Sequence, residues 1–255
     1  MNIKESLEDL KWVDTHCHIQ LMGKDFKEED IFNLEYLIIP GVNVESSQRA
    51  KQMSQQIQKN AFWSAGLHPH EADSFHEIKE ELSLLMEEAD LIGETGLDYY
   101  RNLSPREQQI ESLQFHLQVA HKMNKPIILH CRDSFSDMYD LLSSSTYRNK
   151  IILHSWTGGN NWTKKFVELD VYFSISGIVT YITAHDLHQS VQHIPIERLL
   201  LETDVPYLTP EPYKGKKNIP SNIMYTAKKL SELLSIPLKE LSDITIANTN
   251  KLMEK

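Results

Sequence analysis

The fold is decided near the N-terminus, by the stretch Lys11-Trp12-Val13-Asp14-Thr15-His16-Cys17-His18-Ile19. In an extended strand successive side chains point to opposite faces, so we expect Asp14, His16 and His18 to share one face. Two imidazoles on one side of a strand can bind one metal ion, which would also satisfy polar groups that point toward a core. The alternative is a pair of hydrogen-bonded core histidines, and this stretch alone does not decide between the two.

The size and composition of the chain set limits on its architecture. It has 255 residues, of which 40% are hydrophobic and 24% charged. About 250 residues is typical of one α/β barrel, so we expect a single domain over residues 1–255. The apolar content is enough for a large core and gives no sign of disorder.

The net charge of −10 and the isoelectric point of 5.6 restrict how the chain can bind phosphate groups. A broad nucleic-acid-binding surface needs clustered Lys and Arg, so a phosphate-bearing partner must bind at a local site. Cys17 and Cys131 lie in apolar runs, which favours buried thiols over a disulfide. No stretch approaches the roughly 18 apolar residues of a membrane span. We therefore expect a cytoplasmic protein with no membrane partner and no obligate protein partner.

Strand-like apolar runs alternate with helix-like segments along the chain, which favours βαβ units around a parallel sheet. Eight strands predict a closed (β/α)8 TIM barrel, which belongs to the α/β class. The expected strands lie near residues 11–19, 35–42, 62–68, 91–98, 126–132, 150–156, 172–178 and 199–206.

Helix signals occur between these runs. Ser104-Pro105-Arg106-Glu107 reads as a capping box that starts a helix, and Asn124-Lys125-Pro126 ends that helix before the next strand. Apolar stripes at helical spacing predict further helices over residues 46–60, 77–88 and 222–234.

Two connections differ from the rest. The link from Gln20 to Glu35 is short and charged and has no convincing helix. The stretch 206–220 is rich in Pro and Gly, and helical sequence resumes directly after it. We interpret it as a structured loop over the barrel mouth rather than as a domain linker.

Strong polar groups gather at the expected strand ends. Active sites of α/β barrels lie at the carboxyl ends of the strands, so this distribution predicts one site. The groups are His16, His18, His68, His70, Glu94, Asp98, His130, Arg132, His154, Glu202 and Asp204. The other six histidines fall in helical or loop segments, where we expect packing or solvated residues. These are His76, His116, His121, His185, His188 and His193.

Four imidazoles and two carboxylates are too many for one three-ligand zinc site and suit two ions. We expect the first ion to bind the opening His-x-His pair and Glu94, whose two oxygens can bridge to a second ion. His130 and His154 would hold the second ion, and Asp204 would complete the site. Mixed nitrogen and oxygen ligands suit Zn, Fe, Ni or Mn, and a water-rich variant could take Mg. The predicted ligands are His16, His18, Glu94, His130, His154 and Asp204.

Six motifs resemble, in order, the sequence blocks of the TatD family of metal-dependent hydrolases, and they cover nearly the whole chain. They are Asp14-Thr15-His16-Cys17-His18, Gly66-Leu67-His68-Pro69-His70, Gly93-Glu94-Thr95-Gly96-Leu97-Asp98-Tyr99, Ile128-Leu129-His130-Cys131-Arg132-Asp133, His154-Ser155-Trp156-Thr157-Gly158 and Leu201-Glu202-Thr203-Asp204-Val205-Pro206-Tyr207-Leu208. The resemblance implies an amidohydrolase-type barrel and a divalent-metal site whose ligands fall on the six residues above. It also implies phosphodiester hydrolysis on DNA by a deoxyribonuclease, often a 3′ exonuclease.

The sequence departs from that family pattern at Gln20, where the family usually has Asp. This departure and the short link that follows bear on the first βα loop, and so on substrate preference. An alternative is a metal-dependent ester or amide hydrolase, such as a D-aminoacyl-tRNA deacylase or a small-molecule amidohydrolase. A binding module with a structural metal is a further class, which His and carboxylate ligands at an open mouth disfavour.

The expected mechanism uses a water whose pKa the ions lower from about 15.7 toward about 7. Asp204 is the candidate general base. Arg132 could bind a phosphoryl oxygen bidentately, or instead form a salt bridge to Asp133 or Asp98. With Glu94 between the ions, Asp204, Glu94 and Arg132 are the expected catalytic residues.

Several residues near the mouth are candidates for substrate binding. His68 and His70 would contact a substrate phosphate or form structural hydrogen bonds. Tyr99, Trp156 and Tyr207 would stack on a base, which is worth about 1–3 kcal/mol per base, or wall the pocket.

Lysines in the 206–220 stretch are a further candidate. Lys214, Lys216 and Lys217 could guide a phosphate backbone, or belong to a solvated loop. The expected partner is a nucleic acid substrate, DNA by the resemblance.

Overall fold

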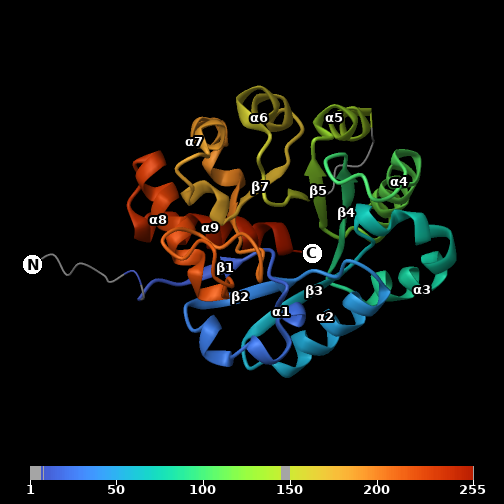
Figure 1. Cartoon of the computed structure of the whole chain (residues 1–255), viewed down its shortest axis with the longest axis horizontal. Helices are drawn as coiled ribbons and strands as arrows, with labels where there is room; N and C mark the ends of the chain where they lie inside the picture. Colours follow the sequence, from blue (N-terminus) through green and yellow to red (C-terminus); the bar gives the residue numbers. More distant parts are fainter. Residues whose placement is uncertain (1–6, 8, 145–149, 255) are drawn as a thin grey trace, which may run out of the picture.

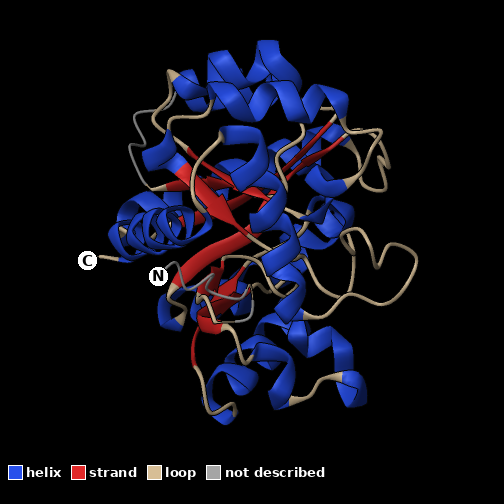
Figure 2. Ribbon diagram, turned by 90° about the vertical axis from the view of Figure 1, so that its left-hand side faces the viewer, coloured by secondary structure: helices blue, strands red, loops and turns tan. Residues whose placement is uncertain are grey.

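The computed structural model describes residues 7, 9–144 and 150–254. Its strands form one parallel sheet in the sequential order β1 to β8, with helices around the outside (Figures 1 and 2). This confirms the predicted (β/α)8 TIM barrel. The strands are β1 (Trp12–Asp14), β2 (Leu34–Ile39), β3 (Asn60–Ala65), β4 (Leu91–Asp98), β5 (Ile127–Arg132), β6 (Ile151–Leu153), β7 (Tyr172–Ile175) and β8 (Leu199–Leu201).

The apolar faces of the helices pack against the sheet and form the larger hydrophobic core. None of the described helices combines the length and apolar content needed to cross a membrane. The helices are α1 (Ile19–Met22), α2 (Val44–Gln56), α3 (Phe75–Glu88), α4 (Arg106–Met123), α5 (Phe135–Ser144), α6 (Gly159–Val167), α7 (His185–Ser190), α8 (Ile223–Leu234) and α9 (Leu238–Met253).

A second buried cluster combines one side chain from each of six strands with Leu252 of α9. Layers of branched side chains from the strands fill the interior of a barrel of this kind. Leu91 and Tyr172 are the first residues of their strands, so this layer lies away from the carboxyl ends. The strand residues are Ile38, Leu91, Ile128, Ile152, Tyr172 and Leu200.

The first and last strands meet through backbone hydrogen bonds near their carboxyl ends. Thr15 N donates to Leu201 O at 3.0 Å, and Asp204 N donates to His16 O at 2.8 Å. These bonds bring the segments that follow β1 and β8 together at the barrel mouth, although they are about 190 residues apart in sequence.

The opening strand is shorter than expected, because β1 ends at Asp14. His16 and His18 therefore follow the strand, and the prediction that they share a strand face with Asp14 was wrong. The Asp14 carboxylate instead accepts hydrogen bonds from Thr203 N at 2.9 Å and His16 N at 3.2 Å. The Asp14 carboxylate therefore holds the segment after β1 and the segment after β8 together at the barrel mouth.

The predicted capping box at Ser104 was also wrong. Helix α4 begins at Arg106, and no side chain caps its N-terminus. The Ser104 hydroxyl donates to His70 O at 2.9 Å, because the loop after β3 lies beside the start of α4. The predicted end of this helix agrees, since Asn124 caps it in the left-handed conformation at φ 52°.

Candidate metal centre

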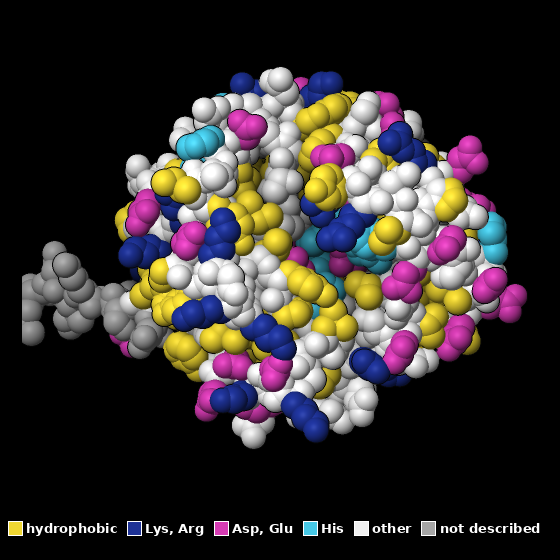
Figure 3. Space-filling model, viewed as in Figure 1, with side chains coloured by type: hydrophobic (Ala, Val, Ile, Leu, Met, Phe, Trp, Pro, Cys, Tyr) yellow, Lys and Arg dark blue, Asp and Glu magenta, His cyan; other side chains and the backbone are white. Residues whose placement is uncertain are grey.

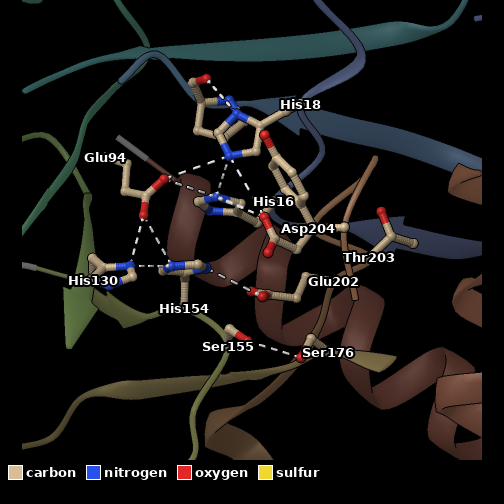
Figure 4. Close-up of polar contacts among 12 residues, drawn as sticks. His16, His18, Glu94, His130, His154, Ser155, Ser176, Glu202, Thr203 and Asp204 are labelled. Carbon is tan, nitrogen blue, oxygen red and sulfur yellow. Dashed lines mark hydrogen bonds and ion pairs between the residues drawn. The ribbon is translucent and has the colours of Figure 1, made fainter. Parts of the chain in front are cut away.

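Glu94 on β4 lies at the centre of the histidine cluster and is only 3% exposed. Its two oxygens face different histidines, as Figure 4 shows. Oε2 lies 3.2 Å from His16 Nε2 and 3.6 Å from His18 Nε2. Oε1 lies 3.1 Å from both His130 Nδ1 and His154 Nε2. The Glu94 carboxylate thus contacts histidines from three places: the loop after β1, strand β5 and the loop after β6.

A glycine lets the strands that carry Glu94 and His130 approach closely. Gly96 on β4 has φ 147°, which L side chains rarely adopt. A Cβ atom at this position would lie 2.0 Å from His130 O, so any side chain would push β5 away. Gly96 therefore permits the strand spacing that places His130 beside Glu94.

Asp204 faces the same cluster from the segment after β8. Its backbone adopts the left-handed conformation at φ 56°. Oδ1 lies 3.7 Å from the Nε2 atoms of both His16 and His18. Burial raises the pKa of Asp204 to about 7, although the nearby His154 and His18 lower it. The side chain is 13% exposed and lines the cleft over the cluster.

Hydrogen bonds on the far side of two rings fix their tautomers. His18 Nδ1 lies 3.2 Å from Pro40 O, and His154 Nδ1 lies 3.3 Å from Glu202 Oε1. A carbonyl and a carboxylate oxygen accept hydrogen bonds, so in both rings Nδ1 carries the hydrogen. The Nε2 lone pairs of these rings then face the cluster, as they do in metal-binding histidines.

Asp98 fixes the third ring. Its Oδ2 accepts from His130 Nε2 at 3.2 Å and from His70 Nε2 at 2.8 Å. Burial raises the pKa of Asp98, but hydrogen bonds from His130, Arg101 N and His70 outweigh this and hold it well below its usual value. This role of Asp98 was not predicted from the sequence. Its spacing of four residues from Glu94 on one strand places both on the same face, and could have revealed it.

His68 differs from these rings. Its Nδ1 accepts a hydrogen bond from His70 N at 3.1 Å, and its Nε2 lies 3.4 Å from Glu94 Oε1. Burial lowers the pKa of His68 to about 4, so the ring is neutral at pH 7. The hydrogen of that neutral ring is therefore on Nε2, where it is donated to Glu94.

The structure brings the six predicted ligands into one cluster. The potential ligand atoms form three sets, and within each set they all lie within 4.8 Å of one another. One set includes Glu202, for which no role was predicted. The sets are His16, His18 and Asp204; His16, His154 and Glu202; and His68, Glu94 and His130.

The cluster lies at the floor of a cleft of about 490 Å³, and Figure 3 shows histidine side chains within this hollow. Arg101, Arg132 and the 56% exposed Tyr207 also line the cleft. The guanidinium of Arg132 lies 3.9 Å from the centre of the Tyr100 ring. Among the described residues Arg132 forms no ion pair, so the salt bridge considered from the sequence is not formed.

Two predicted aromatic contacts with substrate were wrong, because neither ring lines the cleft. Trp156 is 2% exposed, and its Nε1 donates to Thr163 Oγ1 at 2.8 Å within the core. The Tyr99 hydroxyl donates to Asp137 Oδ2 at 2.7 Å. Both rings have structural partners that hold them away from the mouth.

The three lysines of the 206–220 loop do not line the cleft either. The Lys214 ammonium lies 3.9 Å from the centre of the Tyr181 ring, and Lys217 pairs with Asp25. Lys216 and Lys217 instead line a separate hollow of about 430 Å³. Guidance of a phosphate backbone by Lys214 and Lys216 therefore stays a prediction, and it would have to act outside the cleft.

Comparison with known proteins agrees with this geometry. Residues 13–254 match the model of the family described as TatD related DNase. An uncharacterized metal-dependent hydrolase of Buchnera aphidicola is 34% identical, over 94% of this chain and 98% of its own. One from Bacillus subtilis is 31% identical, over 94% and 97%. A crystal structure of a TatD homologue from Escherichia coli has a TM-score of 0.87 at 24% identity, covering 94% and 97%. The chain therefore belongs to the TatD family of metal-dependent hydrolases.

Proposed function

We propose that this protein hydrolyses phosphodiester bonds of DNA with the help of two divalent metal ions, as an exonuclease acting at 3′ ends. The observation that carries the proposal is the placement of Glu94, with each oxygen 3.1–3.2 Å from histidine nitrogens on a different side. The family's description as TatD related DNase supports DNA as the substrate.

The donor atoms fit metal ions. His130 Nδ1, His154 Nε2 and Glu94 Oε1 lie 3.1 Å from one another. The hydrogens of both rings are on the far nitrogens, so three lone pairs converge and need positive charge between them. Nitrogen and carboxylate donors suit Zn, Mn, Fe or Ni, and Mg where water completes the shell. The proposed ligands are His16, His18 and Asp204 for one ion and His130 and His154 for the other, with Glu94 shared.

Bound ions would lower the pKa of water and stabilise negative charge on phosphoryl oxygens. Asp204 lines the cleft, and its Oδ1 lies 3.7 Å from the Nε2 atoms of both His16 and His18, so we assign it as the general base. His68 donates to Glu94 and orients its carboxylate.

Three further side chains serve the substrate. Arg132 pairs with no carboxylate in the part of the chain that the structure describes, and it lines the cleft, so its guanidinium can bind phosphoryl oxygens bidentately. His70, held by Asp98, presents its ring to the same cleft and can contact a phosphate. Tyr207 is the exposed aromatic ring on which a base can stack.

The experiment that tests this function is a metal-reconstituted assay. The metal-free protein would be supplied separately with Mn²⁺, Zn²⁺, Mg²⁺, Ni²⁺ and Fe²⁺, and tested on DNA oligonucleotides labelled at either end. A D-aminoacyl-tRNA and a panel of small esters and amides would be tested in parallel. We expect metal-dependent release of nucleotides from the 3′ end of DNA as the dominant activity.

Asp204→Asn provides the matched test of the general base. It should fold normally, with an unchanged circular dichroism spectrum, and lose turnover. Asp243→Asn, at an exposed position on α9, is the control. Faster hydrolysis of the aminoacyl-tRNA or of an ester than of DNA would overturn the DNA assignment, and normal turnover by Asp204→Asn would overturn the role of Asp204.

A further inference from the structure

The cleft over the candidate metal centre continues beyond it. A second hollow of about 280 Å³ shares His130, His154 and Asp204 with the main cleft, so both open onto the same ligands. A third hollow of about 330 Å³ adjoins the second and shares Thr157 and Ile178 with it. The centre therefore lies part of the way along a groove and not at its end. We name the second and third hollows the α7 arm.

The two sides of the groove differ in charge. The main cleft has two arginines, Arg101 and Arg132. Arg132 also lines the second hollow, where it joins the main cleft, and among the described residues no other Lys or Arg lines the α7 arm. The arm offers hydroxyl groups from Thr157 and Thr183 and the apolar Ile178. At its outer end it has the imidazole of His185 and the carboxylate of Asp186.

The wall of the arm is held in place by the loop after β8. Gly177, which begins the short helical turn that contains Ile178, packs so closely on this loop that a Cβ atom would lie 2.2 Å from Leu208 O. The Tyr181 hydroxyl donates to Thr209 O at 3.0 Å. The arm is therefore a formed site whose shape follows from the same loop that borders the main cleft.

We propose that the α7 arm binds the terminal nucleoside of the DNA strand, while the main cleft binds the phosphate-bearing remainder. This rests on the proposed function. At a strand end, one side of the scissile phosphate carries a single nucleoside with no further phosphate, and the other side carries many. Beyond the shared Arg132 the arm has no Lys or Arg, which matches the uncharged side, and Asp186 repels a further phosphate. The arm thus selects strand ends.

The arm can be filled with Ile178→Trp and compared with Ile182→Trp. Ile182 is 82% exposed in the same loop and lines none of the three hollows. We expect Ile178→Trp to lower kcat/KM for a DNA oligonucleotide at least about tenfold more than for bis(p-nitrophenyl) phosphate, since base contacts are lost. Anisotropy should show weaker binding of a labelled oligonucleotide to the metal-free variant. Ile182→Trp should leave both rates and the binding unchanged.

Asp186→Asn tests selection at the outer end. We expect it to raise the rate on oligonucleotides that carry a terminal 3′ phosphate about two- to fivefold relative to 3′ hydroxyl ends, as removal of an exposed charge predicts. If Ile178→Trp lowered kcat/KM equally for the oligonucleotide and for bis(p-nitrophenyl) phosphate, or for neither, the proposed role of the arm would be overturned. A wild-type protein that hydrolyses neither substrate with any metal would overturn the proposed function itself, which is a different result.

Discussion

At the scale of single residues, Glu94 is the side chain on which the two halves of the centre depend. Glu94→Gln keeps the shape of the side chain but removes its charge and one of its two carboxylate oxygens. We expect the amount of bound metal to fall. We also expect kcat/KM to drop by more than 100-fold, because loss of a group that only hydrogen-bonds a metal ligand already costs about 10- to 100-fold. Elemental analysis and the nuclease assay measure this. Glu111→Gln on the exposed surface of α4 is the control, and wild-type metal content in Glu94→Gln would refute the bridging role.

Asp98 acts one step further out, through His130. In Asp98→Asn the amide keeps only one acceptor oxygen. Its NH2 group must therefore face either the two ring nitrogens that Oδ2 now serves, at 2.8 Å and 3.2 Å, or Arg101 N, which Oδ1 now serves at 2.8 Å. We expect metal affinity to fall about 10- to 100-fold, measured by titration of the metal-free protein. Asp137→Asn, whose carboxylate accepts from Tyr99 outside the cleft, should bind metal normally. An unchanged affinity in Asp98→Asn would remove Asp98 from the site.

At the scale of elements, sequence periodicity predicted the strands well but not where they end. It could not show that the backbone after Asp14 bonds to the segment after β8, because that depends on barrel closure. His16 and His18 converge through this closure and not through strand alternation. The capping-box prediction at Ser104 failed for a similar reason, since its Oγ donates to His70 O, 34 residues away, and accepts from Asp73 N, 31 residues away, instead of capping α4.

The position of Ser104 leads to a stability prediction. Ser104→Ala removes the hydrogen bond to His70 O and the acceptor for Asp73 N. We expect a loss of about 0.5–1.5 kcal/mol in the free energy of unfolding, measured in urea. Hydrogen exchange should speed up at Asp73 in the loop after β3. Faster exchange confined to the first turn of α4 would instead support a capping role.

His116 links α4 to the strand end that carries His68. Its Nε2 accepts from Leu67 N at 3.0 Å, and its Nδ1 donates to Ser112 O at 2.7 Å. Burial lowers its pKa from 6.5 to about 4. The stability this neutral ring contributes is therefore complete above pH 6.5 and is lost as the pH falls toward 4.

The prediction compares the wild-type protein with His116→Gln, which does not titrate. Between pH 7 and pH 5 the wild-type free energy of unfolding should fall by about 2 kcal/mol more than that of the variant. Urea unfolding at both pH values measures the difference. Identical pH dependence in the two proteins would show that the His116 ring is not held neutral by burial.

At the scale of the whole molecule, alternation of segments and the clustering of polar groups at strand ends predicted the barrel and the meeting place of the ligands. The groups that bind the far nitrogens of His18 and His154, which are Pro40 O and Glu202, could not be predicted from the sequence. They depend on how each ring is oriented and not on the spacing of residues. Trp156 shows the opposite error, since a residue near the mouth in sequence can face the core.

The acidic chain, with a net charge of −10, should bind DNA through few phosphate contacts. Arg101 and Arg132 are the cleft arginines, and about two contacts predict a slope near −1.4 when log affinity is plotted against log salt concentration for a single strand. Arg132→Gln should reduce this slope by about 0.7. Neutralising Lys214, Lys216 and Lys217 together should leave it unchanged, because these side chains lie outside the cleft. Anisotropy at several salt concentrations measures all three, and a wild-type slope steeper than about −3 would mean that the lysine-bearing loop contacts the strand after all.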